Sequence, residues 1–317
     1  MMKTPCFIGV DTSNYTTSIA FCTEDGKIVA NLKVPLPVKE GTRGLRQSDA
    51  VFLHTKNMPL LLERAKPYFE EYDPVAIGVS AYPRSQDGSY MPCFLAGKAI
   101  AAALSVALDV PIYDFSHQDG HVMAALYSSG AETKIFERDF IAFHVSGGTT
   151  EVLLVSPCEK DFSCKIIGGT LDMNAGQAID RVGVAMGLSF PCGPEMERLA
   201  LSRGNVKSKD LRVCVSDGKC NLSGLENRAI KLFQENGSKE ETAKFVLDFI
   251  SETLARIAEQ IKDKYPSLPI VYSGGVMSCS IIQKRLSGAD TYFAEPQFSA
   301  DNAAGIALLA RRAHQNN

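Results

Sequence analysis

The chain contains 317 residues, enough for two domains of ordinary size, and 45% of them are hydrophobic, as in globular proteins with packed cores. Its formal net charge of −3 excludes a broad basic surface of the kind that attracts nucleic acid, so any RNA contact would have to be local or come from a partner. The nine cysteines include no Cys-x-x-Cys pair, and neither a leader segment nor an apolar run of membrane-spanning length is recognisable. We therefore expect a cytoplasmic protein without disulfide bonds and without a membrane-bound part.

The first part of the chain alternates between strand and helix patterns. From Cys6 to Phe21 an apolar run, a polar turn and a β-branched run predict a strand, a turn and a second strand. The next predicted elements are a helix from Ser48 to Glu71, a buried strand from Val75 to Ser80, an Ala-rich helix from Phe94 to Leu108 and a short strand from Val110 to Phe115. Such alternation indicates α/β architecture.

The strand–turn–strand pattern recurs in the second part of the chain. Phe140–Val145 leads into the polar turn Ser146–Thr150, and Glu151–Val155 returns. Each copy alone fits an ordinary hairpin, but the two together suggest a chain built from two related lobes. We expect an N-terminal lobe of residues 1–115, a C-terminal lobe of residues 116–299, and a last helix, 300–317, that packs back on the N-terminal lobe.

Two further patterns lie towards the end of the chain. Apolar residues at helical spacing predict a long core helix from Lys239 to Tyr265. A strand, Pro269–Tyr272, then leads through paired glycines, Gly274 and Gly275, into a helix from Ser278 to Leu286. Glycines at such a place let backbone amides approach an anion at a helix N-terminus, although a tight turn without a ligand explains them equally well.

The run Ser116–His121 places two imidazoles, those of His117 and His121, four residues apart. Residues with this spacing share one face of a helix, and neutral imidazole is a common ligand of transition metals. Asp301, near the end of the chain, offers a carboxylate that could join them. A pair on a solvated helix face, with Asp301 compensating the charge of a helix N-terminus, is the alternative.

Thermolysin-type proteolysis is disfavoured by the residues between the two histidines. Such enzymes carry His-Glu-x-x-His, with the Glu as general base. Here the corresponding residue is Gln118, whose amide cannot accept the proton, and Asp119 lies on a different face of the helix.

Short motifs along nearly the whole chain resemble those of one family when taken as an ordered set. They are the opening Asp11-Thr12-Ser13, the His117 to His121 pair, Val145-Ser146-Gly147-Gly148, Leu171-Asp172 with Ala175-Gly176 and Asp180, Pro191-Cys192-Gly193-Pro194, Ser223-Gly224-Leu225, Gly274-Gly275-Val276, and Asp301-Asn302. In this order they resemble the universal tRNA threonylcarbamoyladenosine synthase family, formerly called O-sialoglycoprotein endopeptidases. That family belongs to the superfamily of acetate and sugar kinases, heat-shock ATPases and actin.

The resemblance implies a two-lobed actin-like fold, a metal site and an adenine-nucleotide site. The metal, iron or zinc with magnesium as a further candidate, would be held by His117, His121 and Asp301. His144 stands near a position where some family members have a metal-binding Tyr, so it is either a fourth ligand or a core side chain. ATP, AMP or an acyl-adenylate would contact Ser13, Ser146, Gly147, Gly148, Asp172, Gly176, Asp180, Gly193, Gly274 and Gly275.

The chain departs from the family at its opening motif. Family members begin with Glu-Thr-Ser-Cys-Asp-Glu-Thr, whose acidic pair is implicated in the transfer step, whereas Tyr15 and Thr16 stand at those two positions here. A different loop, residues 82–88, also replaces the usual Gly-Pro-Gly before the Ala-rich helix. Asp11 remains as a candidate catalytic residue.

By resemblance the activity is transfer of a threonylcarbamoyl group to tRNA, with related-fold protein subunits as further partners. The alternatives are a divergent paralogue acting as a different acyl- or carbamoyltransferase, a non-catalytic nucleotide-binding regulator, and a sugar or acetate kinase. The kinase alternative leaves the histidine pair unexplained.

Overall fold

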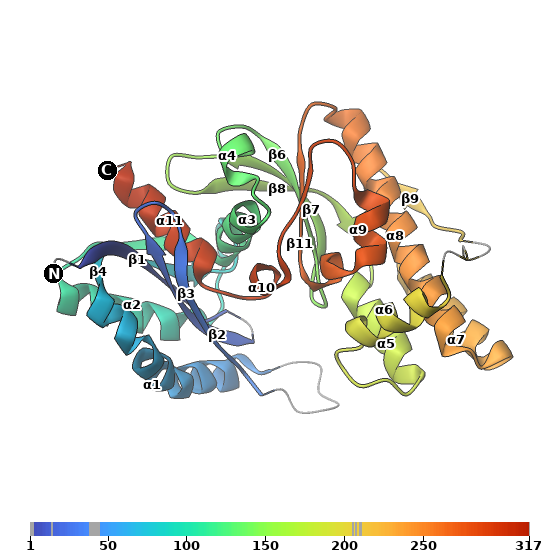
Figure 1. Cartoon of the computed structure of the whole chain (residues 1–317), viewed down its shortest axis with the longest axis horizontal. Helices are drawn as coiled ribbons and strands as arrows, with labels where there is room; N and C mark the ends of the chain where they lie inside the picture. Colours follow the sequence, from blue (N-terminus) through green and yellow to red (C-terminus); the bar gives the residue numbers. More distant parts are fainter. Residues whose placement is uncertain are drawn as a thin grey trace. The chain divides into compact units, whose positions relative to one another are not determined.

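The computed structural model describes residues 3–13, 15–37, 45–204, 206, 208 and 211–316, except for the side chain of Thr133. Asn14, in the first predicted turn, lies outside the described residues. Contacts divide the chain into two compact units (Figure 1). Unit 1 comprises Met1–Tyr127, Pro157–Cys164 and Gln297–Asn317, and unit 2 comprises Ser128–Ser156 and Lys165–Pro296.

Unit 1 is built on a five-stranded sheet in the order β3-β2-β1-β4-β5. Its strands are β1 (Thr4–Asp11), β2 (Thr16–Thr23), β3 (Ile28–Pro35), β4 (Tyr72–Tyr82) and β5 (Ile112–Ser116), and its helices are α1 (Gln47–Glu71), α2 (Phe94–Leu108), α3 (His117–Ser128) and α11 (Ala304–Gln315). The first three strands pair antiparallel, and β4 and β5 run parallel to β1. The predicted strand–turn–strand unit is therefore confirmed as the β1–β2 hairpin.

The two faces of this sheet are packed differently. Ile8, Val10 and Ile77 point into an apolar core shared with α1 and α2. On the opposite face the sheet carries glycines, and α11 lies directly on them. A Cβ atom on Gly9 would come within 2.3 Å of the Ala303 carbonyl oxygen, and one on Gly78 within 2.7 Å of that of Ile306. This close approach brings the loop before α11 to the carboxyl ends of β1 and β4.

Unit 2 contains a seven-stranded sheet in the order β12-β11-β6-β7-β8-β10-β9. Its strands are β6 (Phe140–Val145), β7 (Thr150–Pro157), β8 (Phe162–Thr170), β9 (Val215–Ser216), β10 (Lys219–Cys220), β11 (Ile270–Ser273) and β12 (Thr291–Phe293), of which β7 and β8 each extend slightly into unit 1. Its helices are α4 (Glu132–Ile135), α5 (Ala175–Ala185), α6 (Gly193–Ser202), α7 (Ser223–Asn236), α8 (Lys239–Lys264) and α9 (Ser280–Leu286). The remaining short helix, α10 (Pro296–Ser299), precedes α11.

The core of unit 2 confirms two sequence predictions. The second strand–turn–strand unit is the antiparallel β6–β7 pair. Ile141, Phe143 and Val145 belong to the main core cluster together with the buried side of α8, whereas His144 on the alternate face of β6 is half-buried and outside that cluster. The helix predicted from Lys239 is accordingly a core helix.

Among the predicted boundaries that differ from the structure, two lie beside the sites described below. The helix expected from Ser278 begins only at Ser280, because a 3₁₀ turn, Gly275–Ser278, comes first and Cys279 is extended (φ −70°, ψ 119°). The division near residue 115 also differs, since α3 packs with unit 1: a Cβ on Gly305 of α11 would lie 1.9 Å from the Gly120 carbonyl oxygen. Among the described helices, none is long and apolar enough to span a membrane.

Candidate metal centre and glycine cradle

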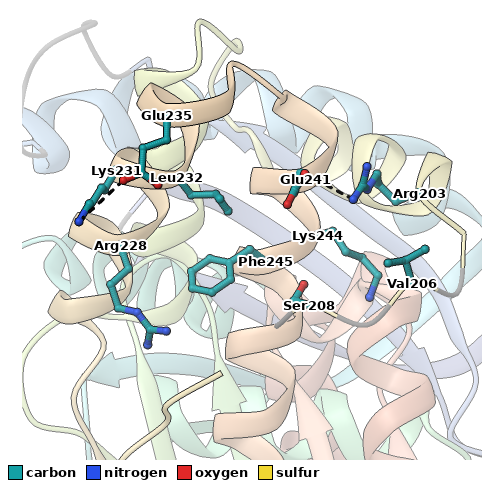
Figure 2. A pocket seen from close by; sticks show the side chains of 10 residues that line it. All are labelled: Arg203, Val206, Ser208, Arg228, Lys231, Leu232, Glu235, Glu241, Lys244 and Phe245. Atoms are coloured by element: carbon teal, nitrogen blue, oxygen red, sulfur yellow. Dashed lines mark ion pairs between the residues drawn. The ribbon is translucent and has the colours of Figure 1, made fainter. Parts of the chain in front are cut away.

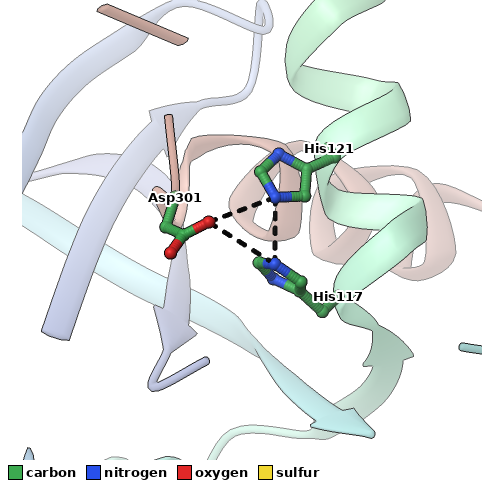
Figure 3. A group of neighbouring side chains, drawn as sticks. All are labelled: His117, His121 and Asp301. Carbon is green, nitrogen blue, oxygen red and sulfur yellow. Dashed lines mark hydrogen bonds and ion pairs between the residues drawn. The ribbon is translucent and has the colours of Figure 1, made fainter. Parts of the chain in front are cut away.

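The three predicted metal ligands lie together within unit 1 (Figure 3). His117 and His121 project from the first turn and a half of α3, and Asp301 approaches from the loop before α11. The Nε2 atoms of the two histidines are 2.9 Å apart. Asp301 Oδ1 lies 3.3 Å from His121 Nε2 and 3.6 Å from His117 Nε2.

This arrangement fits a bound divalent ion. Ligand atoms placed at about 2.0–2.1 Å around a tetrahedral ion are roughly 3.3 Å from one another, close to the three separations here. The side chains of His117, His121 and Asp301 are only 12%, 13% and 20% exposed. Two imidazoles and one carboxylate leave room for further ligands, a pattern typical of catalytic rather than purely structural metal sites.

The loop before α11 explains why Asp301 is free to face the histidines. Asn302, not Asp301, pairs with a backbone amide at the start of α11, since its Oδ1 accepts a hydrogen bond from the Ala304 amide at 3.0 Å. The Asn302 amide nitrogen in turn donates to the Phe298 carbonyl at 3.0 Å. Compensation of a helix N-terminus, the alternative role considered for Asp301, is therefore not what the geometry indicates.

Each charged group of the cluster shifts the pKa of its neighbours. Burial alone would lower the pKa of His117, but the neighbouring carboxylates of Asp11 and Asp301 raise it to about 10. Burial opposes ionisation of Asp301, yet hydrogen bonds from both histidines hold the pKa of this carboxyl well below its usual range. Both shifts stem from carboxylates packed against imidazoles in a protected place, which also suits a cation.

Asp11 contacts the cluster from the end of β1. Its Oδ2 lies 3.1 Å from Nδ1 of His117, on the side of the ring away from Asp301. Its Oδ1 accepts a hydrogen bond from the Ser13 amide at 2.8 Å, and the residue is only 1% exposed. Ser13 itself is fully buried, and its hydroxyl has no hydrogen-bond partner among the described residues.

Asp119 lies on α3 between the two histidines but has a different environment. Its carboxylate accepts hydrogen bonds from the hydroxyls of Ser116 at 2.6 Å and Ser85 at 3.1 Å. Burial raises the pKa of Asp119 to about 6. Asp119 thus fixes the start of α3 and ties it to the loop of residues 82–88, rather than pointing at the metal ligands.

The nucleotide-binding residues predicted from the glycine motifs lie in unit 2, apart from Ser13. Their glycines divide into two kinds. Gly176 and Gly274 are packed against backbone: a Cβ on Gly176 would lie 2.7 Å from the Gly147 amide nitrogen, and one on Gly274 would lie 2.2 Å from the Val145 carbonyl oxygen. Gly274 also has a φ of 99°, which side chains disfavour.

The second kind faces open space. Apart from chain neighbours and the backbone of the same helix, no described atom lies within 4 Å of the Cβ position of Gly147, Gly148, Gly193 or Gly275. Ser146 shapes the turn that carries the first two, because its Oγ accepts hydrogen bonds from the Gly148 and Thr149 amides at 3.3 and 3.1 Å. Those two amides therefore point into the turn, and the room beside the glycines is what remains available to a ligand.

The two predicted aspartates of this region hold neighbouring backbone in place. Asp172 Oδ1 accepts hydrogen bonds from the amides of Met173 and Leu222, at 2.6 and 2.8 Å, and Oδ2 accepts one from Ser223 at 3.1 Å. Asp180 Oδ1 accepts one from the Cys192 amide at 2.8 Å. Contact with a nucleotide stays a prediction for both residues, as metal binding does for His144.

Unit 2 also has a pocket of about 610 Å³ between α7 and α8 (Figure 2). It is rich in cations, but most of them already pair with acids: Arg203 lies 3.4 Å from Glu241, and Lys231 lies 3.8 Å from Glu235. Arg228 is placed over the ring of Phe245, 5.2 Å from its centroid. These groups do not converge on a common point, so the pocket is a weaker site than the histidine cluster.

The sequence predicted the grouping of His117, His121 and Asp301, which the structure brings together, but not the polar side chains around them. The contacts of Asp11 with His117 and of Ser85 with Asp119 join segments far apart in sequence, and no local pattern marks them. The only available signal was the polar residue Asp11 at the end of an otherwise apolar strand.

Comparison with known proteins agrees with the motifs. A model of the tRNA N6-adenosine threonylcarbamoyltransferase family matches residues 54–308. A relative of that name from Thermus thermophilus is 31% identical over 322 residues, which span 99% of this chain and 94% of the relative. Another from Methanopyrus kandleri is 27% identical over 315 residues, spanning 98% and 88% of the two chains.

Solved structures with low sequence identity share the fold. HypF from T. kodakarensis matches with a TM-score of 0.61 at 12% identity, over 98% of this chain and 48% of HypF. The activator of the 2-hydroxyisocaproyl-CoA dehydratase from Clostridium difficile, with bound ADPNP, matches with a TM-score of 0.53 at 13% identity, over 98% and 96% of the two chains. Together with a glucokinase of the ROK family from Streptomyces griseus, at a TM-score of 0.50, 14% identity and 98% and 99% coverage, these matches confirm the predicted actin-like, sugar-kinase-like fold.

Proposed function

Because this chain belongs to the tRNA N6-adenosine threonylcarbamoyltransferase family, we propose that it transfers a threonylcarbamoyl group from an adenylate to an amine, with N6 of a tRNA adenine as the first candidate acceptor. The observation that carries the proposal is the cluster of His117, His121 and Asp301, which forms in a chain that matches the family over most of its length. An adenine inside a stacked RNA helix is shielded, so the acceptor base would have to be presented unstacked.

The metal is part of this proposal. His117 and His121 would hold a divalent iron or zinc ion through their Nε2 atoms, and Asp301 would hold it through Oδ1. When bound with open coordination positions, such an ion polarises the carbamoyl carbonyl and orients the substrate. The protein contributes the low exposure of the cluster, which keeps bulk water from the reacting group.

The adenylate is the second part. Open space beside Gly147, Gly148, Gly193 and Gly275 supports a role in accepting a phosphate or ribose close to the backbone. AMP would leave after transfer, so the chain should bind AMP as well as the adenylate.

A second candidate function is transfer of a carbamoyl or acyl group to an acceptor other than tRNA. It is favoured by Tyr15 and Thr16, which provide no carboxylate for proton transfer where the resembled family has two acids. Tyr15 is exposed and Thr16 half-buried, so neither position is hidden from a substrate. The first candidate function would also involve related-fold protein subunits. They would supply the RNA contacts that a chain of net charge −3 lacks.

The test is single-turnover transfer from threonylcarbamoyl-adenylate. The purified chain is incubated with the adenylate and unmodified tRNA, with and without prior removal of metal by a chelator. Modified adenosine that forms only with metal supports the first candidate. Consumption of the adenylate with small amines, but not with tRNA, supports the second. If the adenylate is not consumed with any acceptor, the proposed transferase function is wrong.

A further inference from the structure

The contact between Asp11 and His117 places a carboxylate directly behind one of the three candidate metal ligands. His117 lies between two acids, with Nδ1 at 3.1 Å from Asp11 Oδ2 and Nε2 at 3.6 Å from Asp301 Oδ1. A metal-bound imidazole is neutral, and only one nitrogen of a neutral imidazole carries a proton. A carboxylate on the Nδ1 side selects the tautomer with the proton on Nδ1 and leaves the lone pair of Nε2 for the cluster.

Asp11 is itself held in one orientation. The Ser13 amide donates to its Oδ1, and the backbone pairing of Asp11 with Ser18 anchors the end of β1. The turn that follows is tied to α2 through Thr12, whose Oγ1 donates to the Cys93 carbonyl at 2.9 Å and accepts from the Gly97 amide at 3.0 Å. This rigidity makes Asp11 suited to orient another side chain.

The same contacts argue against a direct chemical role. Both oxygens of Asp11 are engaged, one by Ser13 and one by His117, and the residue is 1% exposed. A general base has to reach the proton that it removes, within hydrogen-bonding distance of the substrate. Asp11 contacts Nδ1 of His117, and the ring of His117 separates it from the candidate metal ligands on the Nε2 side. Asp11 could therefore influence a substrate bound there only through that ring.

We propose that Asp11 is a positioning residue, which fixes His117 in the Nδ1–H tautomer and aims its Nε2 at the metal. The inference rests on the proposed metal site and replaces the catalytic role predicted for Asp11 from the sequence. Carboxylate, imidazole and metal would then form the triad by which proteins orient metal-binding histidines. Loss of such an outer carboxylate typically weakens metal binding about 10- to 100-fold.

Metal affinity tests this directly. Zinc binding to the full chain is measured by competition with a chromogenic chelator, for the wild type and for D11N and D11A. In D11N the amide oxygen can still accept from Ser13, which preserves the turn, while the amide nitrogen would donate to Nδ1 and favour the wrong tautomer of His117. We expect both variants to bind zinc at least about tenfold more weakly.

D25N is the matched control. Asp25 lies in the turn between β2 and β3 of the same unit, where its carboxylate accepts a hydrogen bond from Thr23, so D25N removes one negative charge without touching His117. Zinc affinity within twofold of the wild type is expected for D25N. Thermal unfolding of the metal-free proteins identifies a variant that is misfolded, and the isosteric D11N then carries the test.

A second measurement reports on the histidine itself. In zinc-loaded, ¹⁵N-labelled wild type, His117 should show a slowly exchanging Nδ1–H and a metal-bound Nε2. The Nδ1–H signal should broaden or disappear in D11A, because water replaces the carboxylate. A merely structural role for Asp11 would not change this signal in a folded variant.

The outcomes separate the two proposals. If the wild type binds zinc and D11N and D11A bind it equally well, Asp11 does not position His117, and the metal site stands. If the wild type binds neither zinc nor Fe²⁺, the metal site and this inference both fail. A wild-type His117 bound through Nδ1, with its proton on Nε2, would also overturn the inference.

Discussion

Simultaneous replacement of His117 and His121 by Ala should abolish metal binding. Two of the three ligand atoms of the cluster disappear, and Asp301 alone cannot retain a transition metal against buffer. Elemental analysis of purified protein should give about one divalent ion per wild-type chain and a background level in the double variant.

Two single variants accompany this measurement. H314A changes a histidine at the end of α11, whose ring packs against Phe7, and should leave the metal content unchanged. H144A tests whether His144 is a fourth ligand. If it is, the metal content of H144A should be lower than that of the wild type. Equal metal content in wild type and double variant would show that the ion, if present, binds elsewhere.

Replacement of Gly147 by Val should weaken binding of ATP, ADP and AMP without unfolding the chain. No described atom lies within 4 Å of its Cβ position, so the new side chain would occupy the room predicted for a ligand. Calorimetry should show at least about a tenfold loss of affinity, since a phosphate would lose its close backbone approach. G275V should behave in the same way.

G288V is the control for both glycine variants, because Gly288 also faces open space but lies outside the predicted cradle. Unchanged affinity is expected for it. If the wild type binds no adenine nucleotide, the resemblance to nucleotide-binding folds is one of architecture only.

At the scale of single residues, the sequence predicted what local spacing determines. The i, i+4 spacing of His117 and His121 was sufficient to place both rings on one side of α3. The environment of Asp11 could not be predicted, because it depends on how β1, α3 and α11 meet. The glycines show the same limit: Gly147 and Gly274 look alike in sequence, yet one faces open space and the other packs on Val145.

Among the helices, the crossing of α3 and α11 should be highly sensitive to added volume. A Cβ on Gly305 would lie 1.9 Å from the Gly120 carbonyl oxygen, so the two helices would have to separate. We expect G305A to lower the free energy of unfolding by at least about 1–3 kcal/mol, the usual cost of overpacking, as measured by urea denaturation.

G224A provides the comparison, because Gly224 lies in the first turn of α7 and, apart from its own helix and chain neighbours, no described atom lies within 4 Å of its Cβ position. It should be neutral or slightly stabilising, since Ala is the better helix former. Equal stability of G305A and the wild type would contradict the close helix contact.

The start of α7 should depend on the ionisation of Asp172. Loss of hydration opposes ionisation of this exposed carboxyl, but hydrogen bonds from Ser223, Leu222 and Met173 outweigh it and lower the pKa of Asp172 to about 2. A lowered pKa means that the contribution of the carboxylate is present above its unfolded pKa of about 3.9 and is lost as the pH falls towards about 2.

Urea denaturation of wild type and D172N at several pH values checks this dependence. The difference between their midpoints should be constant above about pH 5 and should shrink as the pH falls towards about 2. A difference that does not depend on pH in that range would mean that the charge of Asp172 does not support α7.

Elements were predicted well where the pattern was long and periodic. The Ala-rich helix has the predicted bounds, Phe94–Leu108, and the core helix α8 begins at the predicted Lys239. The prediction failed after Gly275, where short apolar runs and paired glycines fit both a helix and a 3₁₀ turn. An extended Cys279 separates the two, a choice that depends on tertiary contacts.

For the whole molecule, we expect weak or absent rescue of a strain that lacks its own tRNA threonylcarbamoyltransferase. Tyr15 and Thr16 replace two acids of the resembled family, and removal of an acid–base group typically costs about 10²- to 10⁴-fold in rate. The double variant Y15D/T16E should rescue growth better than the wild type, provided that both accumulate equally. Full rescue by the wild type would show that the acidic pair is dispensable.

The packing of α11 on β1 has a consequence for the order of folding. A chain is synthesised from its N-terminus, so β1 is among the first segments made and α11 among the last. Gly9 nevertheless meets the backbone of Ala303, and contacts between such distant segments form slowly. Unit 1 therefore cannot finish folding during early synthesis, and Asp301 reaches His117 and His121 only when α11 docks. Capture of the proposed metal ion would then mark the completion of folding, because a half-made chain offers His117 and His121 but not yet Asp301.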